Sequence, residues 1–189
     1  MLIAGVDEAG RGALIGPLVV ASVILPPFPE LKVDFVDSKI IGHKKRESLF
    51  LSIKTLALAY SVVAVSPKMI DKVNILEATL FGMRKVIKKL RLTPNVVLID
   101  GNKVPKIEGV PVGCLVKGDS LIPEISAASI VAKVVRDRLM LKYHNKYPDY
   151  SFDLHKGYGT SLHYQEIMKN GILDEHRKSF NLTRQGVLF

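Results

Sequence analysis

The chain has 189 residues, 48% hydrophobic and 24% charged, a composition that predicts a globular protein with one real core and excludes a disordered one. Its single cysteine, Cys114, excludes an internal disulfide, and with no membrane-length apolar stretch and no signal-peptide pattern we expect a cytoplasmic protein without a membrane partner. The net charge of +9 favours polyanionic partners, nucleic acids above all.

The first half of the chain alternates predicted strands with predicted helices. Apolar runs at 2–6 and 18–25 lie close in sequence and indicate a β-hairpin. Apolar residues at helical spacing predict a helix over 43–60, followed by a strand over 61–65 that Pro67 ends. A second helix is predicted over 75–90.

The second half continues the alternation. Strands are predicted at 95–99 and 110–116, the latter with Cys114 as a small core residue. The longest helix is expected to begin near Pro123 and to end before Pro148, with a short helix over 161–169. Together these elements predict an α/β fold with a mixed sheet, with a first domain over 1–148 and a C-terminal extension over 149–189.

Acidic residues follow three of the predicted strands. Asp7 and Glu8 come directly after the first, Asp100 ends another, and Asp119 follows a third, each near a glycine. If the strands are neighbours, their carboxyl ends meet at one edge of the sheet, where ligands of α/β proteins gather. Carboxylates without His or Cys select Mg²⁺ or Mn²⁺, and two such ions about 4 Å apart support phosphoryl displacement. The alternative for the Asp7–Glu8 pair is a solvated turn.

The strand pleat limits how the first two acids can act. Neighbouring side chains on a strand point to opposite faces, so Asp7 and Glu8 cannot both bind one ion directly if both are regular strand residues. We expect Asp7 to bind metal directly. Glu8 would reach the site through a bend, its backbone carbonyl or a water.

In this order, the motifs closely resemble one family, the bacterial type 2 ribonucleases H, or ribonuclease HII. The resemblance is collinear and covers nearly the whole chain. It is carried by Asp7-Glu8-Ala9-Gly10-Arg11-Gly12, Asp37-Ser38-Lys39, Asp100-Gly101-Asn102, Lys117-Gly118-Asp119, Ala127-Ala128-Ser129, Arg136-Asp137, Lys156-Gly157-Tyr158 and His176-Arg177-Lys178.

The resemblance implies a ribonuclease H-like fold, with a central mixed sheet flanked by helices and a helical C-terminal extension. It implies hydrolysis of the RNA strand of RNA–DNA hybrids. It also implies nicking 5′ of ribonucleotides embedded in duplex DNA, leaving 5′-phosphate and 3′-hydroxyl ends. Asp7, Glu8, Asp100 and Asp119 match the family's catalytic ligands for two Mg²⁺ or Mn²⁺ ions.

Two segments match the family's means of recognising the sugar. Gly10, Arg11 and Gly12 match the loop whose backbone contacts the ribose 2′-hydroxyl, the group that distinguishes RNA from DNA. Tyr158 matches the tyrosine that stacks on the sugar after the cut site. The alternative for Tyr158 is a ring packed under a loop.

Other matches concern the phosphate backbone. Ser38 and Lys39 match a substrate contact, although residues 40–42, Ile-Ile-Gly, depart from the family's usual lysine, leucine and small hydroxyl residue. Lys156, next to Tyr158, is a further expected contact. As for any surface lysine, the alternative is a solvated charge.

Four more residues have side chains that can bind metal or act as a nucleophile, but we predict neither role for them. His155, His163 and His176 lack metal-ligand spacing, and we expect none of them to bind metal. Ser129 is interpreted as a helix-packing residue and not a nucleophile, since no partner histidine is indicated.

The last five residues, 185–189, resemble the short peptide by which bacterial replication enzymes bind the sliding clamp, with Gln185, Leu188 and Phe189 in the matching positions. The alternative is a tail packed on its own core, because short motifs match by chance. We otherwise expect a monomer. Two other functions stay open: a junction resolvase of the same fold, and a hybrid-binding module without catalysis, which would not need four acids.

Overall fold

The computed structural model describes residues 1–27 and 42–183. Ser38, Lys39 and the predicted clamp-binding peptide at 185–189 lie outside the described residues. Within the described ranges, no helix is long and apolar enough to cross a membrane. The elements are β1 (Ile3–Ala9), β2 (Leu18–Ile24), α1 (His43–Leu56), β3 (Ala59–Val65), α2 (Pro67–Lys88), β4 (Val96–Asp100), β5 (Val112–Leu115), η1 (Gly118–Ser120), α3 (Pro123–Lys146), α4 (Phe152–His155) and α5 (Ser161–Asn170).

The five strands form one mixed sheet in the order β3-β2-β1-β4-β5. β1 and β2 are antiparallel, as predicted for a hairpin, and β3 pairs antiparallel with β2. β4 runs parallel to both β1 and β5. The carboxyl ends of β1, β4 and β5 therefore lie at the same edge of the sheet, which is the arrangement that the acidic residues at the strand ends require.

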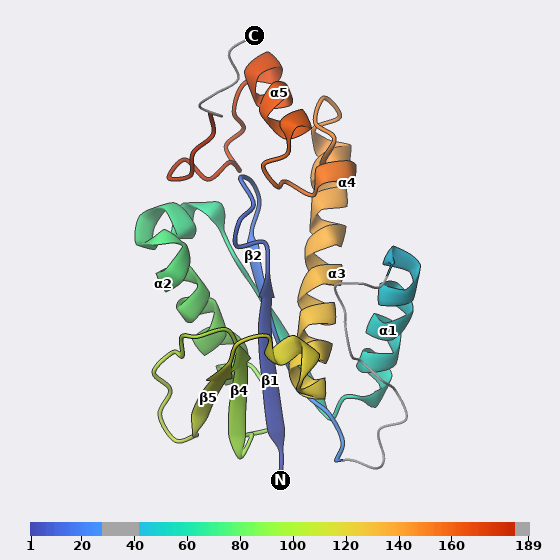
Figure 1. Ribbon diagram of the computed structural model, residues 1–189, viewed down its shortest axis with the longest axis vertical. Coiled ribbons are helices and arrows are strands. Elements are labelled where there is room, and N and C mark those ends of the chain that lie inside the picture. The colour runs from blue at the N-terminus through green and yellow to red at the C-terminus, as the bar shows by residue number, and fades with distance from the viewer. Residues whose placement is uncertain (28–41, 184–189) are drawn as a thin grey trace.

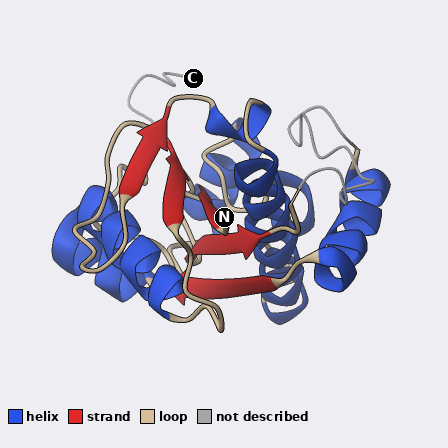
Figure 2. Cartoon of the chain, turned by 90° about the horizontal axis from the view of Figure 1, so that it is seen from below, coloured by secondary structure: helices blue, strands red, loops and turns tan. Residues whose placement is uncertain are grey.

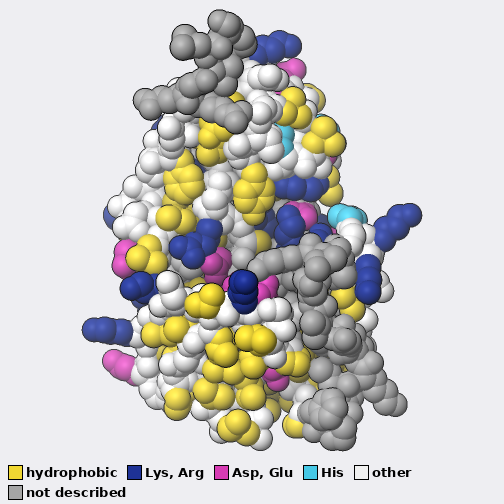
Figure 3. Space-filling model, in the orientation of Figure 1, with side chains coloured by type: hydrophobic (Ala, Val, Ile, Leu, Met, Phe, Trp, Pro, Cys, Tyr) yellow, Lys and Arg dark blue, Asp and Glu magenta, His cyan; other side chains and the backbone are white. Residues whose placement is uncertain are grey.

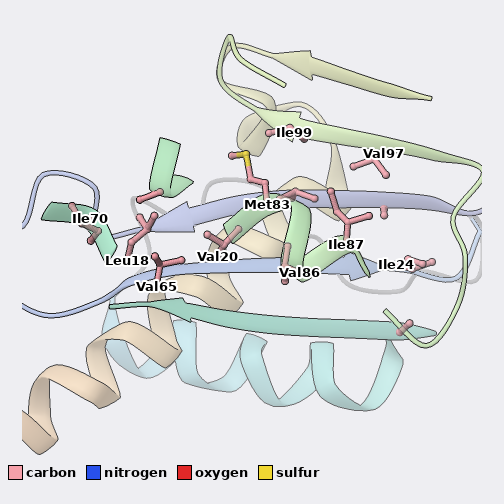
Figure 4. Packing of buried hydrophobic residues seen from close by; sticks show 14 residues of the cluster. Leu18, Val20, Ile24, Val65, Ile70, Met83, Val86, Ile87, Val97 and Ile99 are labelled. Atoms are coloured by element: carbon pink, nitrogen blue, oxygen red, sulfur yellow. The ribbon is translucent and has the colours of Figure 1, made fainter. Parts of the chain in front are cut away.

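Helices cover both faces of the sheet (Figures 1 and 2), which confirms the predicted α/β architecture. α2 packs on one face, where Met83 and Val86 contact Val20 and Ile99 in a fully apolar cluster (Figure 4). α3 packs on the other face, with α1 outside it. The helices α4 and α5 lie beyond the carboxyl ends of β1 and β4, at the end of the molecule opposite the N-terminus (Figure 1).

Local signals explain where α2 begins and bends. The Ser66 side chain accepts a hydrogen bond from the Met69 N–H, and Pro67 occupies the first turn, where its missing N–H costs nothing. Asn74 interrupts the helix with φ 68°, and its side chain accepts from the N–H groups of Leu76 and Glu77. The helix predicted from residue 75 is therefore the second, straight part of α2.

Several predicted boundaries were wrong, and two of them have a clear physical cause. The helix predicted over 43–60 ends at Leu56, because Ala57 is extended and the Leu58 N–H donates to the carbonyl of Ile24. Pairing with β2 outweighed the helical spacing. β1 continues past Val6 to Ala9, because the backbone of Asp7 and Glu8 pairs with β2.

Cys114 was wrongly predicted to be buried. It is exposed, in keeping with the position of β5 as the edge strand of the sheet. α3, by contrast, is more buried than predicted. Besides its predicted apolar stripe it buries Ile130, Val131 and Val134, since it lies between the sheet and α1.

Candidate active site

The carboxyl end of β1 presents its two acids on opposite faces, as the pleat predicts. Asp7 pairs with Ala21, which belongs to the apolar cluster under α3, and Glu8 pairs with Val20, which belongs to the cluster under α2. The Glu8 N–H donates to Asp7 Oδ1 at 2.7 Å. Glu8 is in turn in contact with Arg11, whose guanidinium lies 3.4 Å from Glu8 Oε1.

The neighbouring parallel strands place the other two acids nearby. Asp100 ends β4, and its Oδ1 accepts a hydrogen bond of 2.8 Å from the N–H of Gly118. Asp119 follows Gly118 on the short turn η1 and is 5% exposed. The backbone of this turn therefore links the position of Asp119 to that of Asp100.

The environment of Asp7 disfavours its charge. Burial, the carboxylate of Glu8 and the carboxylate of Asp100 together raise the pKa of Asp7 well above its ordinary value, while a hydrogen bond from the Ser129 side chain opposes the rise. Ser129 therefore contacts the site, and the prediction that it only packs its helix was wrong. A divalent cation would remove this repulsion.

A cleft of about 390 Å³ opens over these acids. Figure 3 shows Lys and Arg side chains close to Asp and Glu side chains across the middle of one face. The cleft brings together most of the predicted site, but it is not lined by Asp119 or Lys156. Its lining residues are Asp7, Glu8, Ala9, Gly10, Arg11, Gly12, Arg46, Asp100, Ser129, Lys133 and Tyr158.

Four lining residues were not predicted as site residues: Ala9, Arg46, Ser129 and Lys133. Ser129 and Lys133 are four residues apart on α3 and Arg136 follows three later, so they share one face of the helix. A polar stripe on an otherwise apolar helix was the available sequence signal. Arg46, on α1, had no such signal, because it stands in a run of basic residues.

The ring of Tyr158, which lines the cleft, makes cation–π contacts with two basic side chains. Its ring centroid lies 5.0 Å from the guanidinium carbon of Arg136 and 5.9 Å from the ammonium of Lys133. Lys133 also forms a 2.7 Å ion pair with Asp137. The ring is half-buried, so part of one face remains available to a ligand.

Two buried arginines fix the loop between β1 and β2. Arg136 donates to the carbonyls of Ile15 and Pro17 and, at 2.9 Å, to that of Lys156. Arg177 donates to the carbonyl of Gly16 twice and to that of Arg11 at 2.9 Å. Burial lowers the pKa of Arg177 to about 9. The loop that carries Gly10, Arg11 and Gly12 is therefore anchored through its carbonyl oxygens.

Comparisons with known proteins agree with this geometry. A profile of the ribonuclease HII family matches residues 4–183. Ribonuclease HII of Shewanella piezotolerans is 50% identical over 184 residues, which is 97% of this chain and 90% of that protein. The chain belongs to the ribonuclease HII family.

Two solved structures support the same assignment. Archaeoglobus fulgidus RNase HII, solved in a complex with PCNA, superimposes with a TM-score of 0.83 at 30% identity and covers 99% of this chain and 98% of its own. Ribonuclease H2 of Pyrococcus horikoshii superimposes with a TM-score of 0.82 at 29% identity, over 97% of this chain and 96% of its own. As a member of this family, the protein is a metal-dependent endoribonuclease that acts on RNA–DNA hybrids.

The acidic side chains of the candidate site suit a hard cation. Asp7, Glu8 and Asp100 line one cleft, and their oxygens are the ligands that Mg²⁺ and Mn²⁺ prefer. Over residues 1–27 and 42–183, no three His, Cys, Asp or Glu side chains are grouped closely enough to hold a metal ion as they stand. The residues fit the ions by chemistry and by the repulsion among the acids.

Lys156 faces away from this group. Its ammonium donates to the carbonyl of Asp153 at 2.7 Å, while its own carbonyl accepts from Arg136. In this conformation Lys156 stabilises the turn that carries Tyr158.

Proposed function

We propose that this protein also nicks duplex DNA 5′ of a single embedded ribonucleotide, by two-metal-ion hydrolysis that leaves 5′-phosphate and 3′-hydroxyl ends. The observation that carries this proposal is the position of Tyr158, which lines the same cleft as Asp7, Asp100 and the loop at Gly10 and Gly12. The ring proposed to contact the sugar and the acids proposed to bind metal therefore line one cleft, where a single bound substrate would touch both.

The residues divide into two roles. Asp7, Glu8, Asp100 and Asp119 would hold two Mg²⁺ or Mn²⁺ ions, which when bound supply an activated water and neutralise the leaving oxygen. Ser129 keeps one orientation of the Asp7 carboxylate through its hydrogen bond. The Gly118 N–H does the same for Asp100.

The remaining lining residues of the cleft are proposed to recognise the substrate. The backbone of Gly10 to Gly12, with Arg11, would contact the ribose 2′-hydroxyl, because the anchored carbonyls of this loop fix its conformation before substrate arrives. The ring of Tyr158 would cover the next sugar, where a deoxyribose fits and an additional hydroxyl is crowded. Arg46 and Lys133, both in the lining, would contact the phosphates, since phosphate contacts position a nucleic acid without reading its sequence.

Lys39, Ser38 and Lys156 stay proposed phosphate contacts. Lys156 would have to leave the carbonyl of Asp153 to make one. Residues 149–189 are proposed as the substrate-contacting extension of the catalytic domain at 1–148.

The test is cleavage of end-labelled duplex DNA that carries one ribonucleotide, with Mg²⁺, with Mn²⁺ and with EDTA. We expect one nick 5′ of the ribonucleotide that EDTA abolishes, and none in an all-DNA duplex. Cleavage of the all-DNA duplex would indicate a different nuclease specificity. Binding without cleavage in either metal would support a hybrid-binding module instead.

We also propose that the peptide at 185–189 binds a sliding clamp. The Archaeoglobus relative was solved with PCNA, and Gln185, Leu188 and Phe189 give this chain its own matching peptide. Affinity for a purified bacterial clamp should fall at least about tenfold when 185–189 is deleted, the loss expected for removing two apolar anchors. Equal affinity with and without the peptide would exclude this role.

A further inference from the structure

Three buried histidines form a cluster beside the candidate active site. The proposed reaction does not use this cluster. His155 ends α4, His163 is on α5, and His176 lies in the segment after α5. The rings of His155 and His163 stack with centroids 4.3 Å apart, and His176 follows at 5.4 Å from His163. All three side chains are buried, so each ring nitrogen needs a hydrogen-bond partner inside the protein.

The partners fix which nitrogen carries the proton in two of the rings. The Leu173 N–H donates to His176 Nδ1 at 2.9 Å, so a neutral His176 carries its proton on Nε2. That proton faces His163 Nε2 at 3.3 Å. His163 therefore accepts at Nε2 and carries its own proton on Nδ1, which donates to the carbonyl of Tyr158 at 3.0 Å.

The third ring supports the neighbouring residue. The Gly157 N–H donates to His155 Nδ1 at 3.1 Å, which places the proton of a neutral His155 on Nε2, facing Glu166 Oε2 at 2.9 Å. Glu166 also accepts from the N–H of Ser151. Two adjacent backbone groups, the N–H of Gly157 and the carbonyl of Tyr158, are thus held by ring nitrogens.

The chain of bonds requires neutral rings. A second proton on His163 would lie on Nε2 and face the ring Nε2–H of His176. A second proton on His176 would lie on Nδ1 and face the backbone N–H of Leu173. Burial, with the neighbouring rings, lowers the pKa values of His163 and His176 to about 4. At neutral pH the direction of every bond is therefore set, from Leu173 through both rings to Tyr158.

We propose that His163 is a positioning residue for Tyr158, and that His176 sets the tautomer of His163 that this role requires. The proposal rests on the proposed function, in which the Tyr158 ring reads the sugar after the cut. His163 holds the backbone of that residue, whereas Arg136 and Lys133 hold its ring. His163 does not line the cleft, so it acts on substrate choice and not on the chemical step.

Two amide substitutions separate this role from a merely structural one. In His163→Asn the amide nitrogen lies where Nδ1 was and still donates to Tyr158. In His163→Gln the amide oxygen takes the place of Nε2 and still accepts from His176, while no donor remains for the carbonyl of Tyr158. His144→Gln is the matched control, because His144 is paired with the carbonyl of Tyr150 and not with Tyr158.

The measurement is kcat/KM on a duplex with one embedded ribonucleotide, divided by kcat/KM on an RNA–DNA hybrid of the same sequence. We expect His163→Gln to lower this ratio about tenfold, the effect of losing one buried hydrogen bond, and His163→Asn and His144→Gln to leave it within about twofold. In a Tyr158→Ala background, His163→Gln should change the ratio no further. Equal ratios for the Asn and Gln variants, or an undiminished effect without the Tyr158 ring, would overturn the proposal.

A readout without catalysis distinguishes this proposal from the proposed function. If the wild-type enzyme cuts the hybrid but not the single-ribonucleotide duplex, the proposed function fails. Nitrogen chemical shifts of the wild-type imidazoles still test the positioning role. We expect His163 protonated on Nδ1 and His176 protonated on Nε2. The opposite tautomer of His163 would remove its bond to Tyr158 and refute the inference.

Discussion

Gly10, which lines the candidate active-site cleft, lies directly against the side chain of Arg136. A Cβ atom on Gly10 would overlap the Nε and Cδ atoms of Arg136, and the residue has φ +94°, a conformation that L-residues rarely adopt. Arg136 cannot retreat, because its guanidinium is bonded to the carbonyls of Ile15, Pro17 and Lys156.

Gly10→Ala should therefore strain the backbone at residue 10 and displace the side chain of Arg136. We expect an unfolding free energy lower by about 2–4 kcal/mol, the sum of an overpacked contact and a strained backbone, and loss of hybrid cleavage. Gly12→Ala is the control, since nothing lies within 4 Å of its Cβ position and its φ is not in the positive region. Urea denaturation of the two variants tests this. Equal stability would mean that Arg136 moves freely.

Arg177 should be irreplaceable by lysine. The guanidinium donates to the carbonyl of Gly16 through Nε and Nη2 and to that of Arg11 through Nη1, a forked geometry that the compact ammonium of a lysine does not reproduce. We expect Arg177→Lys to lower the unfolding free energy by about 2–4 kcal/mol. The neighbouring exposed Lys178 gives the control, since Lys178→Met should stay within about 0.5 kcal/mol of wild type. A stable Arg177→Lys enzyme would contradict the anchoring role of the guanidinium.

Asp7 should destabilise the metal-free protein. Its charge is buried and repelled by Glu8 and Asp100, which is why its pKa is raised. Because the charged form is the disfavoured one, Asp7→Asn should raise the unfolding free energy in EDTA at pH 7. It should also abolish cleavage while largely preserving substrate binding.

The same variant tests the metal site by a second route. Mg²⁺ or Mn²⁺ should raise the melting temperature of the wild-type protein, and much less that of Asp7→Asn. Asp174→Asn is the control, because that side chain is 96% exposed. Retained turnover in Asp7→Asn, or the same metal-induced shift in both proteins, would contradict the assignment of Asp7.

The histidine cluster should make stability fall in mild acid. The folded state holds His163 and His176 neutral down to about pH 4, whereas in the unfolded chain they titrate near 6.5. Between these values the unfolded state binds more protons, so the unfolding free energy decreases as the pH falls from about 6.5 to about 4. The charged neighbours Glu166 and Glu175 have pKa values lowered from 4.5, so they titrate below most of this window.

The measurement is the pH dependence of the urea midpoint between pH 7 and pH 5. We expect His163→Asn to have a slope smaller than wild type by close to one bound proton. His155 lies against the same ring and is retained in both proteins, so it does not account for the difference. An unchanged slope would show that His163 is not held neutral.

Local sequence determined most of the elements of this protein. Apolar runs followed by Asp7, Asp100 and Asp119 predicted strands with acids at their carboxyl ends, because both features are local in the sequence. That these strands are parallel neighbours, which brings the acids to one edge, came from the fold. The pleat also predicted that Asp7 and Glu8 face opposite sides of the sheet, and they do. The match to ribonuclease HII was available from the same segments.

Only the tertiary structure decided the rest. Local patterns do not say which element covers which. They therefore did not show that Cys114 is exposed on the edge strand of the sheet, or that pairing with β2 ends the helix at Leu56. Nor do they reveal contacts between distant segments, such as Ser129 on Asp7 or Arg177 on the carbonyl of Arg11. Those contacts arise because a buried charge or polar group must find its partner wherever the folded chain brings one near.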